Sequence, residues 1–372
     1  MAYDFYMPAR VVGGENVVTK QSALLKKFGN TCLVVTGGTG AKQSGALAEL
    51  TAALDKENIS YGIYDKIGAN PLVTACHEAG RLAVEIGADF LVGIGGGSAL
   101  DAVKAVAVFA ANPEIEPEEV YAMNFKNEPL PTVGIGTTSG TGSEISAVSV
   151  LTDTKGVKRS IKGDFGYFNL VFADWRYTCS CPMSVTVSTA LDAFMHAAEG
   201  WLGPKCNEPA TAFAAECLPK IYKWLKYFYA TNELPDEKGR EELYHASLSA
   251  GFTLNYCGTL FPHPVGYILT EHYGIPHGRA CAAFFDKLLQ RAEEFAPERA
   301  AALCTLLCDS RENIIKTVNN LADCSDIEIS SERAAELIKR WKAIPKNFEC
   351  TPGGYAPALA ADALVELKGK IY

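Results

Sequence analysis

FLVGIGGGSALDAVKAVAVFAA (90–111) is the most informative stretch for the fold, because a short apolar run meets a glycine-rich turn and continues as an apolar helical pattern. A continuous apolar run is typical of a strand buried on both faces of a parallel sheet. Helical patterns separate several runs of this kind, which lie at 31–38, 60–67, 90–97 and 132–138. This βαβ rhythm predicts an α/β domain with a mostly parallel sheet and helices on its faces.

The second half of the chain has a different pattern. Two further apolar segments, 147–153 and 170–175, are candidates for additional strands, but long helical periodicities dominate after about residue 178. We therefore predict two domains, an α/β domain over residues 1–178 and an all-helical domain over 179–372. Such an arrangement is expected to leave a cleft between the domains, where ligands commonly bind.

Composition and charge narrow the class of protein. The 372 residues are 48% hydrophobic and 21% charged, as in globular proteins, and the formal net charge of -9 argues against nucleic acid or an anionic membrane as the main partner. We expect no signal peptide, because the first twelve residues lack its basic and apolar regions. The twelve cysteines include no C-x-x-C pair, which indicates reduced thiols and a cytoplasmic location.

Two glycine-rich turns that follow candidate strands are suited to bind a phosphate group. GIGGGSALD (93–101) opens a helix, whose N-terminus and backbone N–H groups favour an anion. This turn matches neither G-x-G-x-x-G nor the P-loop, and Ser98 with Asp101 also fits a helix-capping box. GTTSGTGSE (136–144) is the second turn, and two such turns at the carboxyl ends of strands favour a nucleotide.

The segment TALDAFMHAAEG (189–200) carries a carboxylate and an imidazole four residues apart on one helix face, at Asp192 and His196. Glu199 continues this stripe, while Thr189 and Asp192 also fit a capping box. Three of the six histidines lie in HPVGYILTEHYGIPHG (263–278), and these are His263, His272 and His277. Imidazoles combined with a carboxylate suit Fe(II) or Zn(II) acting as a Lewis acid with an open position for substrate.

Together these motifs resemble the iron-containing (group III) alcohol dehydrogenase family, in particular its 1,3-propanediol and butanol dehydrogenase branch. The resemblance runs from end to end and rests on GGGSALDAVKA (95–105), TTSGTGSE (137–144) and the segments 189–200 and 263–278. It implies a dehydroquinate synthase-like architecture, a homo-oligomer, and a dinucleotide-binding domain followed by a metal-binding, catalytic one. It assigns the metal, Fe2+ with Zn2+ as the alternative, to Asp192, His196, His263 and His277, and leaves His272 outside the site.

The resemblance also implies a nicotinamide cofactor held by Gly37, Gly38, Asn70, Gly95, Gly96, Gly97, Ser98, Asp101, Thr137, Thr138, Thr141 and Lys158. Members that prefer NAD carry an aspartate where this chain has Gly37, so we expect NADP, with NAD less favoured. In an ordinary nucleotide-binding arrangement Asp65 would be the candidate acid, although a surface turn is its commoner location. Tyr267 replaces a second histidine found in many members, so Tyr267 or solvent would take over any proton-relay role.

The implied activity is metal-dependent, NADP(H)-linked hydride transfer that acts on primary alcohols, diols or short aldehydes. Glu199 is either a hydrogen-bond partner of a ligand imidazole or a solvated carboxylate. Alternatives on the same fold are glycerol dehydrogenase, a hydroxyacid–oxoacid transhydrogenase and a lyase similar to dehydroquinate synthase. A nucleotide-binding sensor with a structural metal is the alternative from another class. We expect no nucleic-acid or membrane partner.

Overall fold

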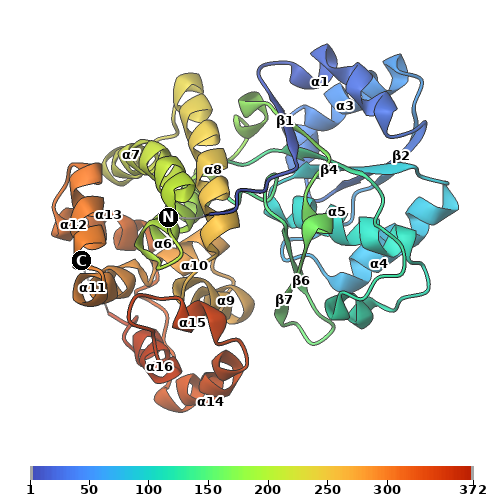
Figure 1. Ribbon diagram of the computed structural model, residues 1–372. Helices are drawn as coiled ribbons and strands as arrows, with labels where there is room; N and C mark the ends of the chain where they lie inside the picture. The colour runs from blue at the N-terminus through green and yellow to red at the C-terminus, as the bar shows by residue number, and fades with distance from the viewer. Residues whose placement is uncertain (1–2, 370–372) are drawn as a thin grey trace. The chain divides into compact units, whose positions relative to one another are not determined.

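The computed structural model describes residues 3–369. The chain divides into two compact units (Figure 1). The first, called the sheet unit below, is Tyr6–Cys181, and the second, called the helical unit, begins at Pro182 and also includes residues 3–5. None of the helices among residues 3–369 is long and apolar enough to cross a membrane.

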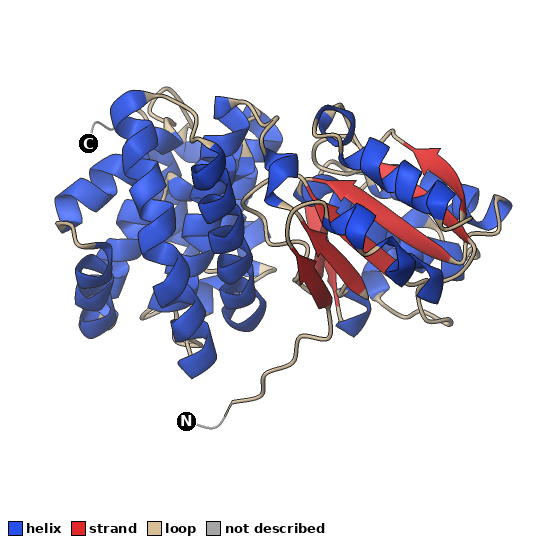
Figure 2. Cartoon of the chain, turned by 90° about the horizontal axis from the view of Figure 1, so that it is seen from above, coloured by secondary structure: helices blue, strands red, loops and turns tan. Residues whose placement is uncertain are grey.

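The sheet unit contains a six-stranded parallel sheet with the order β1-β8-β5-β4-β2-β3 (Figure 2). Its strands are β1 (Arg10–Gly13), β2 (Thr31–Thr36), β3 (Ser60–Tyr64), β4 (Phe90–Gly95), β5 (Thr132–Gly136) and β8 (Leu170–Ala173). Every residue of β4 and β5 is buried, as expected for continuous apolar runs at the centre of a sheet. The predicted parallel sheet is confirmed.

Helices cover both faces of this sheet. The longer ones are α3 (Ala46–Lys56), α4 (Val73–Glu85) and α5 (Gly97–Ala111), and the short ones are α1 (Val17–Lys20) and α2 (Gly40–Gln43). Alternate side chains of a strand point to opposite faces, so Leu91 joins the hydrophobic cluster of α4 and α5, whereas Val92 joins that of α1 and α3. Short 3-10 helices complete the unit at Ser22–Lys27, Pro117–Ala122, Asp164–Gly166 and Trp175–Thr178.

Two details of the sheet unit differ from the expectation. The short edge strand β1 was not predicted, because it has only four residues, none of them buried, and shows no alternation that would mark a strand. The segment expected at 147–153 is a strand, β6 (Val148–Thr152), but it lies outside the main sheet and pairs antiparallel with β7 (Lys158–Lys162). The tight turn between them, with Gly156 at φ 79°, favours this local hairpin over a crossover into the parallel sheet.

The helical unit confirms the predicted all-helical second half. Its elements are α6 (Met183–Leu202), α7 (Glu208–Thr231), α8 (Glu237–Cys257), α9 (Pro262–Tyr273), α10 (His277–Ala282), α11 (Phe285–Phe295), α12 (Pro297–Leu307), α13 (Arg311–Ala322), α14 (Ser331–Lys342), α15 (Lys346–Glu349) and α16 (Pro357–Val365). The segment rich in histidine, glycine and proline is itself helical. Prolines occupy the first turn of α9, where no N–H donor is needed, and Gly274 ends it at φ 67°.

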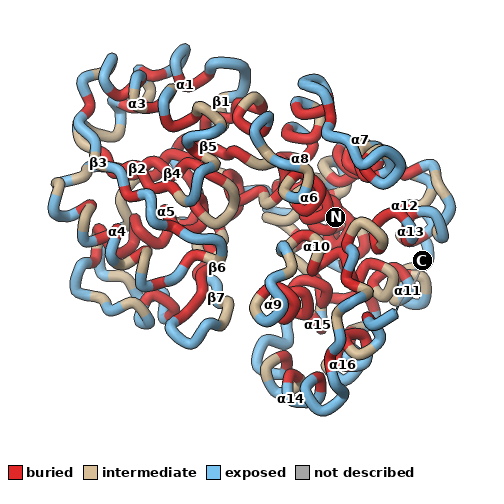
Figure 3. Tube along the Cα trace, turned by 180° about the vertical axis from the view of Figure 1, so that it is seen from behind, coloured by how far each residue is buried: buried red, intermediate tan, exposed pale blue. Residues whose placement is uncertain are grey.

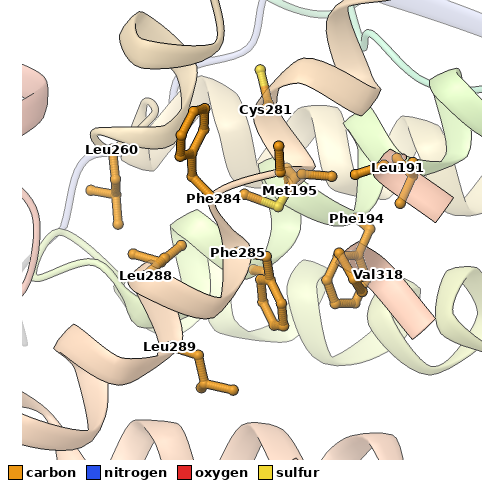
Figure 4. Packing of buried hydrophobic residues seen from close by; sticks show 14 of the residues in the cluster. Leu191, Phe194, Met195, Leu260, Cys281, Phe284, Phe285, Leu288, Leu289 and Val318 are labelled. Atoms are coloured by element: carbon orange, nitrogen blue, oxygen red, sulfur yellow. The ribbon is translucent and has the colours of Figure 1, made fainter. Parts of the chain in front are cut away.

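Helix α6 is the central element of the helical unit and is buried along most of its length (Figure 3). Its apolar side packs in one hydrophobic cluster with α10 and α11, where Leu191, Phe194 and Met195 lie near Phe284 and Phe285 (Figure 4). Because neighbouring helices surround α6, its polar side is buried as well. Buried polar groups are costly unless they are paired, so this side of α6 requires partners from other segments.

Candidate functional site

The polar side of α6 presents three buried ionisable side chains, Asp192, His196 and Glu199, which are 2%, 4% and 0% exposed. The helix begins at Met183, so Asp192 lies well inside it. Thr189 donates its hydroxyl to the carbonyl of Thr186 at 3.3 Å. The capping-box interpretation of Thr189 and Asp192 is therefore wrong, and the buried carboxylate needs another explanation.

Two other helices bring their histidines to this carboxylate. His263 lies in the first turn of α9 and His277 is the first residue of α10. The Oδ1 atom of Asp192 lies 3.6 Å from Nε2 of His196, and 3.8 Å from Nε2 of both His263 and His277. His272 is exposed at the far end of α9. The fold thus brings together the four residues that the resemblance assigns to the metal.

A glycine makes this approach of α10 to α6 possible. A Cβ atom on Gly278 would lie 1.8 Å from the carbonyl oxygen of Ser188 and 2.8 Å from Cβ of Asp192. Only a residue without a side chain allows the two backbones to come this close. The glycine that follows His277 therefore sets the distance between His277 and Asp192.

The charge state and the unsatisfied atoms of the cluster fit a divalent cation. Although burial raises the pKa of Asp192, its electrostatic interactions with His196 and His277 hold that pKa below its usual range, so the carboxylate is ionised. Asp192 Oδ1 and His263 Nε2 are buried and make no hydrogen bond to any described residue. Imidazole nitrogens and a carboxylate oxygen are ordinary ligands of Fe(II) and Zn(II). The residues present therefore fit such a metal.

Glu199 holds one of the imidazoles in place. Its Oε1 atom lies 2.7 Å from Nδ1 of His263, and its Oε2 atom accepts the backbone N–H of Leu260 at 2.5 Å. Burial raises the pKa of Glu199, although the charge of His263 opposes this shift. The interpretation as a solvated carboxylate is wrong. A carboxylate on Nδ1 fixes the ring so that Nε2 faces Asp192, as carboxylates that bind metal-ligating histidines commonly do.

Two further residues lie beside His277. The Cys281 sulfur is 3.6 Å from Nδ1 of His277, and the Tyr267 ring stacks on the His277 imidazole with a centroid distance of 5.4 Å. Tyr267 was a candidate from the sequence, whereas Cys281 was missed. The signal that could have found it was the spacing of four between His277 and Cys281, which equals that between Asp192 and His196.

In the sheet unit, the two glycine-rich turns lie together at the carboxyl ends of neighbouring strands. Gly95 and Gly136 are paired in the register of β4 and β5, and Thr137 donates its N–H to the carbonyl of Gly95 at 2.9 Å. A Cβ atom on Gly97 would lie 2.7 Å from the side chain of Thr141. The second turn therefore contacts the first closely, and only glycine fits at their contact.

The predicted cofactor residues fall into several local environments. Most of them lie in turns that follow a strand: Gly37 and Gly38 come after β2, Gly95, Gly96, Gly97 and Ser98 join β4 to α5, and Thr137, Thr138 and Thr141 follow β5. Two others lie elsewhere. Asn70 precedes α4 with φ 55°, and Lys158 is the first residue of β7. Helix α5 starts at Gly97 without a side-chain cap, so the capping-box interpretation of Ser98 and Asp101 is wrong. Asp101 instead accepts the N–H of Val150 at 2.9 Å and ties α5 to β6.

Gly37 has a packing role of its own. A Cβ atom there would lie 1.9 Å from the carbonyl oxygen of Ile67, so an aspartate would force the backbone to move. The absence of an acid at Gly37 therefore has a structural cause that is independent of the cofactor. Gly38 differs, since it has φ 53° and a Cβ atom there would have no other atom within 4 Å. Asp65, the other acid considered for the cofactor, forms an ion pair with Lys42 at an exposed position.

A buried charged group holds the segment that follows the second glycine-rich turn against α5. Lys104 is fully buried and donates to the carbonyls of Ser146 and Val148 at 2.9 and 2.8 Å, while its Nζ atom lies 3.8 Å from Asp101 Oδ1. Burial lowers the pKa of Lys104 to about 8 and raises the pKa of Glu144 to about 7. No role was assigned to Lys104 or Glu144 from the sequence, because a sequence motif does not show which of its residues are buried.

The raised pKa of Glu144 predicts a pH-dependent effect of Glu144→Gln. The folded state binds the proton of Glu144 more tightly than the unfolded chain does. Burial of this carboxyl group therefore does not destabilise the folded state below about pH 4.5, and destabilises it by the full amount above about pH 7. We expect Glu144→Gln to stabilise the protein at about pH 8 by roughly 2 kcal/mol more than at about pH 5. Thermal unfolding at both pH values measures this, with the exposed Glu114→Gln as control. Equal effects at both pH values would contradict the prediction.

Comparisons with known proteins agree with this geometry. The sequence matches the iron-containing alcohol dehydrogenase family over residues 8–175 and the C-terminal region of the Fe-containing alcohol dehydrogenase family over residues 186–334. It is 29% identical to sulfoacetaldehyde reductase from Bilophila wadsworthia over 88% of this chain and 84% of that protein. It is 26% identical to the NAD-dependent methanol dehydrogenase of Bacillus methanolicus over 99% of this chain and 92% of that protein. A crystal structure of an iron-containing alcohol dehydrogenase from Thermotoga maritima superimposes on this chain with a TM-score of 0.91. The two sequences are 32% identical, and the match covers 99% of this chain and 100% of that one.

Proposed function

Because this chain belongs to the iron-containing alcohol dehydrogenase family, we propose that it catalyses metal-dependent hydride transfer between primary alcohols or diols and NADP+, and reduces short aldehydes in the reverse direction. The observation that carries this proposal is the convergence of three imidazoles on one buried carboxylate oxygen, Asp192 Oδ1. A stabilising ion pair would need one imidazole, whereas three imidazoles around a carboxylate are typical of a metal site.

We propose that Asp192, His196, His263 and His277 hold Fe2+, or Zn2+ in its place. The bound metal supplies a Lewis acid for the substrate oxygen, and the nicotinamide supplies the hydride acceptor. Asp192 contributes the negative charge that a cation needs, and Glu199 orients the imidazole of His263 through Nδ1. Tyr267, stacked on His277 and partly exposed, is the side chain placed to exchange a proton near this cluster.

We also propose that the sheet unit binds the cofactor through the two turns that meet at the ends of β4 and β5. The full set is Gly37, Gly38, Asn70, Gly95, Gly96, Gly97, Ser98, Asp101, Thr137, Thr138, Thr141 and Lys158. Backbone N–H groups at the start of α5 favour a pyrophosphate. In functional terms residues 1–178 would form the dinucleotide-binding domain and 179–372 the metal-binding, catalytic one.

Gly38 offers a cleaner test of NADP preference than Gly37. An aspartate tolerates the left-handed conformation at Gly38, and no atom obstructs its Cβ, whereas an aspartate at Gly37 meets the carbonyl of Ile67. We expect Gly38→Asp to lower kcat/KM for NADP+ relative to NAD+ by roughly 10- to 100-fold, because a carboxylate repels the 2′-phosphate. Gly38→Asn is the uncharged control. Wild-type preference for NAD+ would refute the NADP assignment.

The activity itself is tested by following NADPH oxidation with a panel of short aldehydes. We expect turnover that stops after chelation and returns with Fe(II) or Zn(II). Tight NADPH binding without turnover of any aldehyde would instead support the nucleotide-binding sensor. Comparison of aldehydes, diols and hydroxyacids in the same assay separates an alcohol dehydrogenase from a glycerol dehydrogenase or a transhydrogenase.

The cellular setting and assembly state complete the proposal. All twelve cysteines are free thiols, which supports a reducing compartment such as the cytoplasm. The homo-oligomer stays a prediction from the family resemblance. Light scattering of the purified protein measures its mass in solution directly.

A further inference from the structure

Cys281 is a fully buried thiol that lies one helical turn after His277 on α10. Its sulfur is 3.6 Å from Nδ1 and 3.8 Å from Nε2 of His277. The sulfur, a carboxylate oxygen of Asp192 and one nitrogen each of His263 and His277 all lie within 4.8 Å of one another. We propose that Cys281 is a metal-binding residue of this site, an inference that rests on the proposed metal-dependent function.

The spacing of these atoms suits a shared cation. Ligands about 2.0–2.3 Å from a tetrahedral zinc lie roughly 3.3–3.8 Å from one another. The sulfur of Cys281 and Oδ1 of Asp192 are each 3.8 Å from Nε2 of His277, at the upper end of that range. A metal at this point therefore has the sulfur within reach, with only small movements of the surrounding side chains.

A buried cysteine is commonly just a small hydrophobic residue, and the same helical unit provides that comparison. Cys217 on α7 is equally buried in the hydrophobic cluster that also contains Cys281, and its sulfur lies 3.6 Å from the carbonyl oxygen of Ala214 in the same helix. Cys281 instead faces imidazoles and a carboxylate whose buried atoms Asp192 Oδ1 and His263 Nε2 lack hydrogen bonds within residues 3–369. Packing alone explains Cys217 but leaves those atoms of the Cys281 cluster unsatisfied.

Cys281 consequently determines which metal the site selects. A sulfur ligand is soft, and soft ligands favour Zn(II) and other thiophilic ions over Mn(II) and Mg(II), which prefer oxygen. With Cys281 the site offers a sulfur donor in addition to the nitrogen and oxygen donors of Asp192, His196, His263 and His277. We therefore expect Cys281→Ser to weaken Zn(II) binding by roughly 10-fold or more while changing Mn(II) binding much less.

Cobalt(II) tests the ligation directly, because thiolate ligands give it an intense near-ultraviolet charge-transfer band in addition to its visible d–d bands. Metal-free wild type, Cys281→Ser and Cys217→Ser are titrated with Co(II). We expect the charge-transfer band in wild type and Cys217→Ser, and d–d bands alone in Cys281→Ser. X-ray absorption of the Zn(II)-loaded wild type, which needs no variant, is expected to show a sulfur neighbour at about 2.3 Å.

The outcomes separate this inference from the proposed function. Visible Co(II) bands without a charge-transfer band in the wild type overturn the role of Cys281 and leave the four-residue metal site intact. A charge-transfer band that survives in Cys281→Ser overturns it as well, because another thiol then binds the metal. No Co(II) or Zn(II) binding by wild type overturns the metal site and, with it, both proposals. If Cys281→Ser fails to fold, the X-ray absorption result decides alone.

Discussion

Replacing His277 by alanine is expected to remove most of the bound metal and to lower kcat/KM by about three orders of magnitude, or roughly 4 kcal/mol of transition-state stabilisation. His277 is the best ligand to remove, because its side chain is 29% exposed while those of Asp192 and His263 are only 3% exposed. Its loss therefore deletes a donor without opening a large cavity. Metal content per chain and kcat/KM, measured on the same preparation, are expected to fall together.

His272→Ala is the matched control, since it removes an exposed imidazole from the same short region of the chain. It should keep full metal content and activity, because His272 lies at the far end of α9 from His263. A His277→Ala protein that retains metal and activity would remove His277 from the proposed site. Circular dichroism of both variants verifies that the helical unit remains folded.

Substituting Gly278 by alanine is the second change with a large expected effect. The added methyl group would lie 1.8 Å from the carbonyl oxygen of Ser188, which belongs to the backbone of α6 and cannot rotate away. Helix α10 must therefore move, and His277 moves with it. Overpacking of this kind costs about 1–3 kcal/mol of stability. A displacement of about 1 Å in a catalytic group lowers activity by about 100-fold, so we expect kcat/KM to fall by that factor at least.

Gly68→Ala serves as the control for Gly278→Ala. Gly68 is exposed and nothing lies within 4 Å of its Cβ position, so the same chemical change there should leave metal binding, activity and thermal stability unchanged. Unfolding curves, metal content and kcat/KM of the two variants are compared. Normal activity of Gly278→Ala would show that α10 and α6 tolerate a wider separation than the structure indicates.

Much of the fold follows from local patterns. Continuous apolar runs such as 90–95 specify buried parallel strands, because every side chain of such a strand faces a layer of helices. Glycine and threonine at the strand ends mark the turns, although the expected strands ran past them by one to three residues. The strand at 147–153 was expected, but its antiparallel pairing with β7 was not, because a five-residue strand does not itself specify its partner.

The four residues proposed to hold the metal also follow from the sequence, through the family resemblance, but the residues that surround them do not. Asp192 and His196 share a helix face through a spacing that sequence reveals directly. Residue spacing alone does not show that Glu199 is buried against His263, that Cys281 reaches the cluster, or that Gly37 lacks room for a side chain. These facts depend on which helices and strands meet, and therefore on contacts between residues far apart in the chain.

The parallel sheet, the helical second half, the glycine-rich turns and the kinds of donor available to a metal are thus all encoded locally. Each of these depends on backbone conformation and side-chain periodicity, which are determined by residues close together in the sequence. The convergence of the donors, by contrast, arises from tertiary packing. The close approach of α10 to α6 at Gly278 brings His277 and Cys281 to Asp192, and Glu199 turns His263 towards the same oxygen. Because α6 is buried on all sides, its ionisable side chains are removed from water and need partners from other segments of the chain.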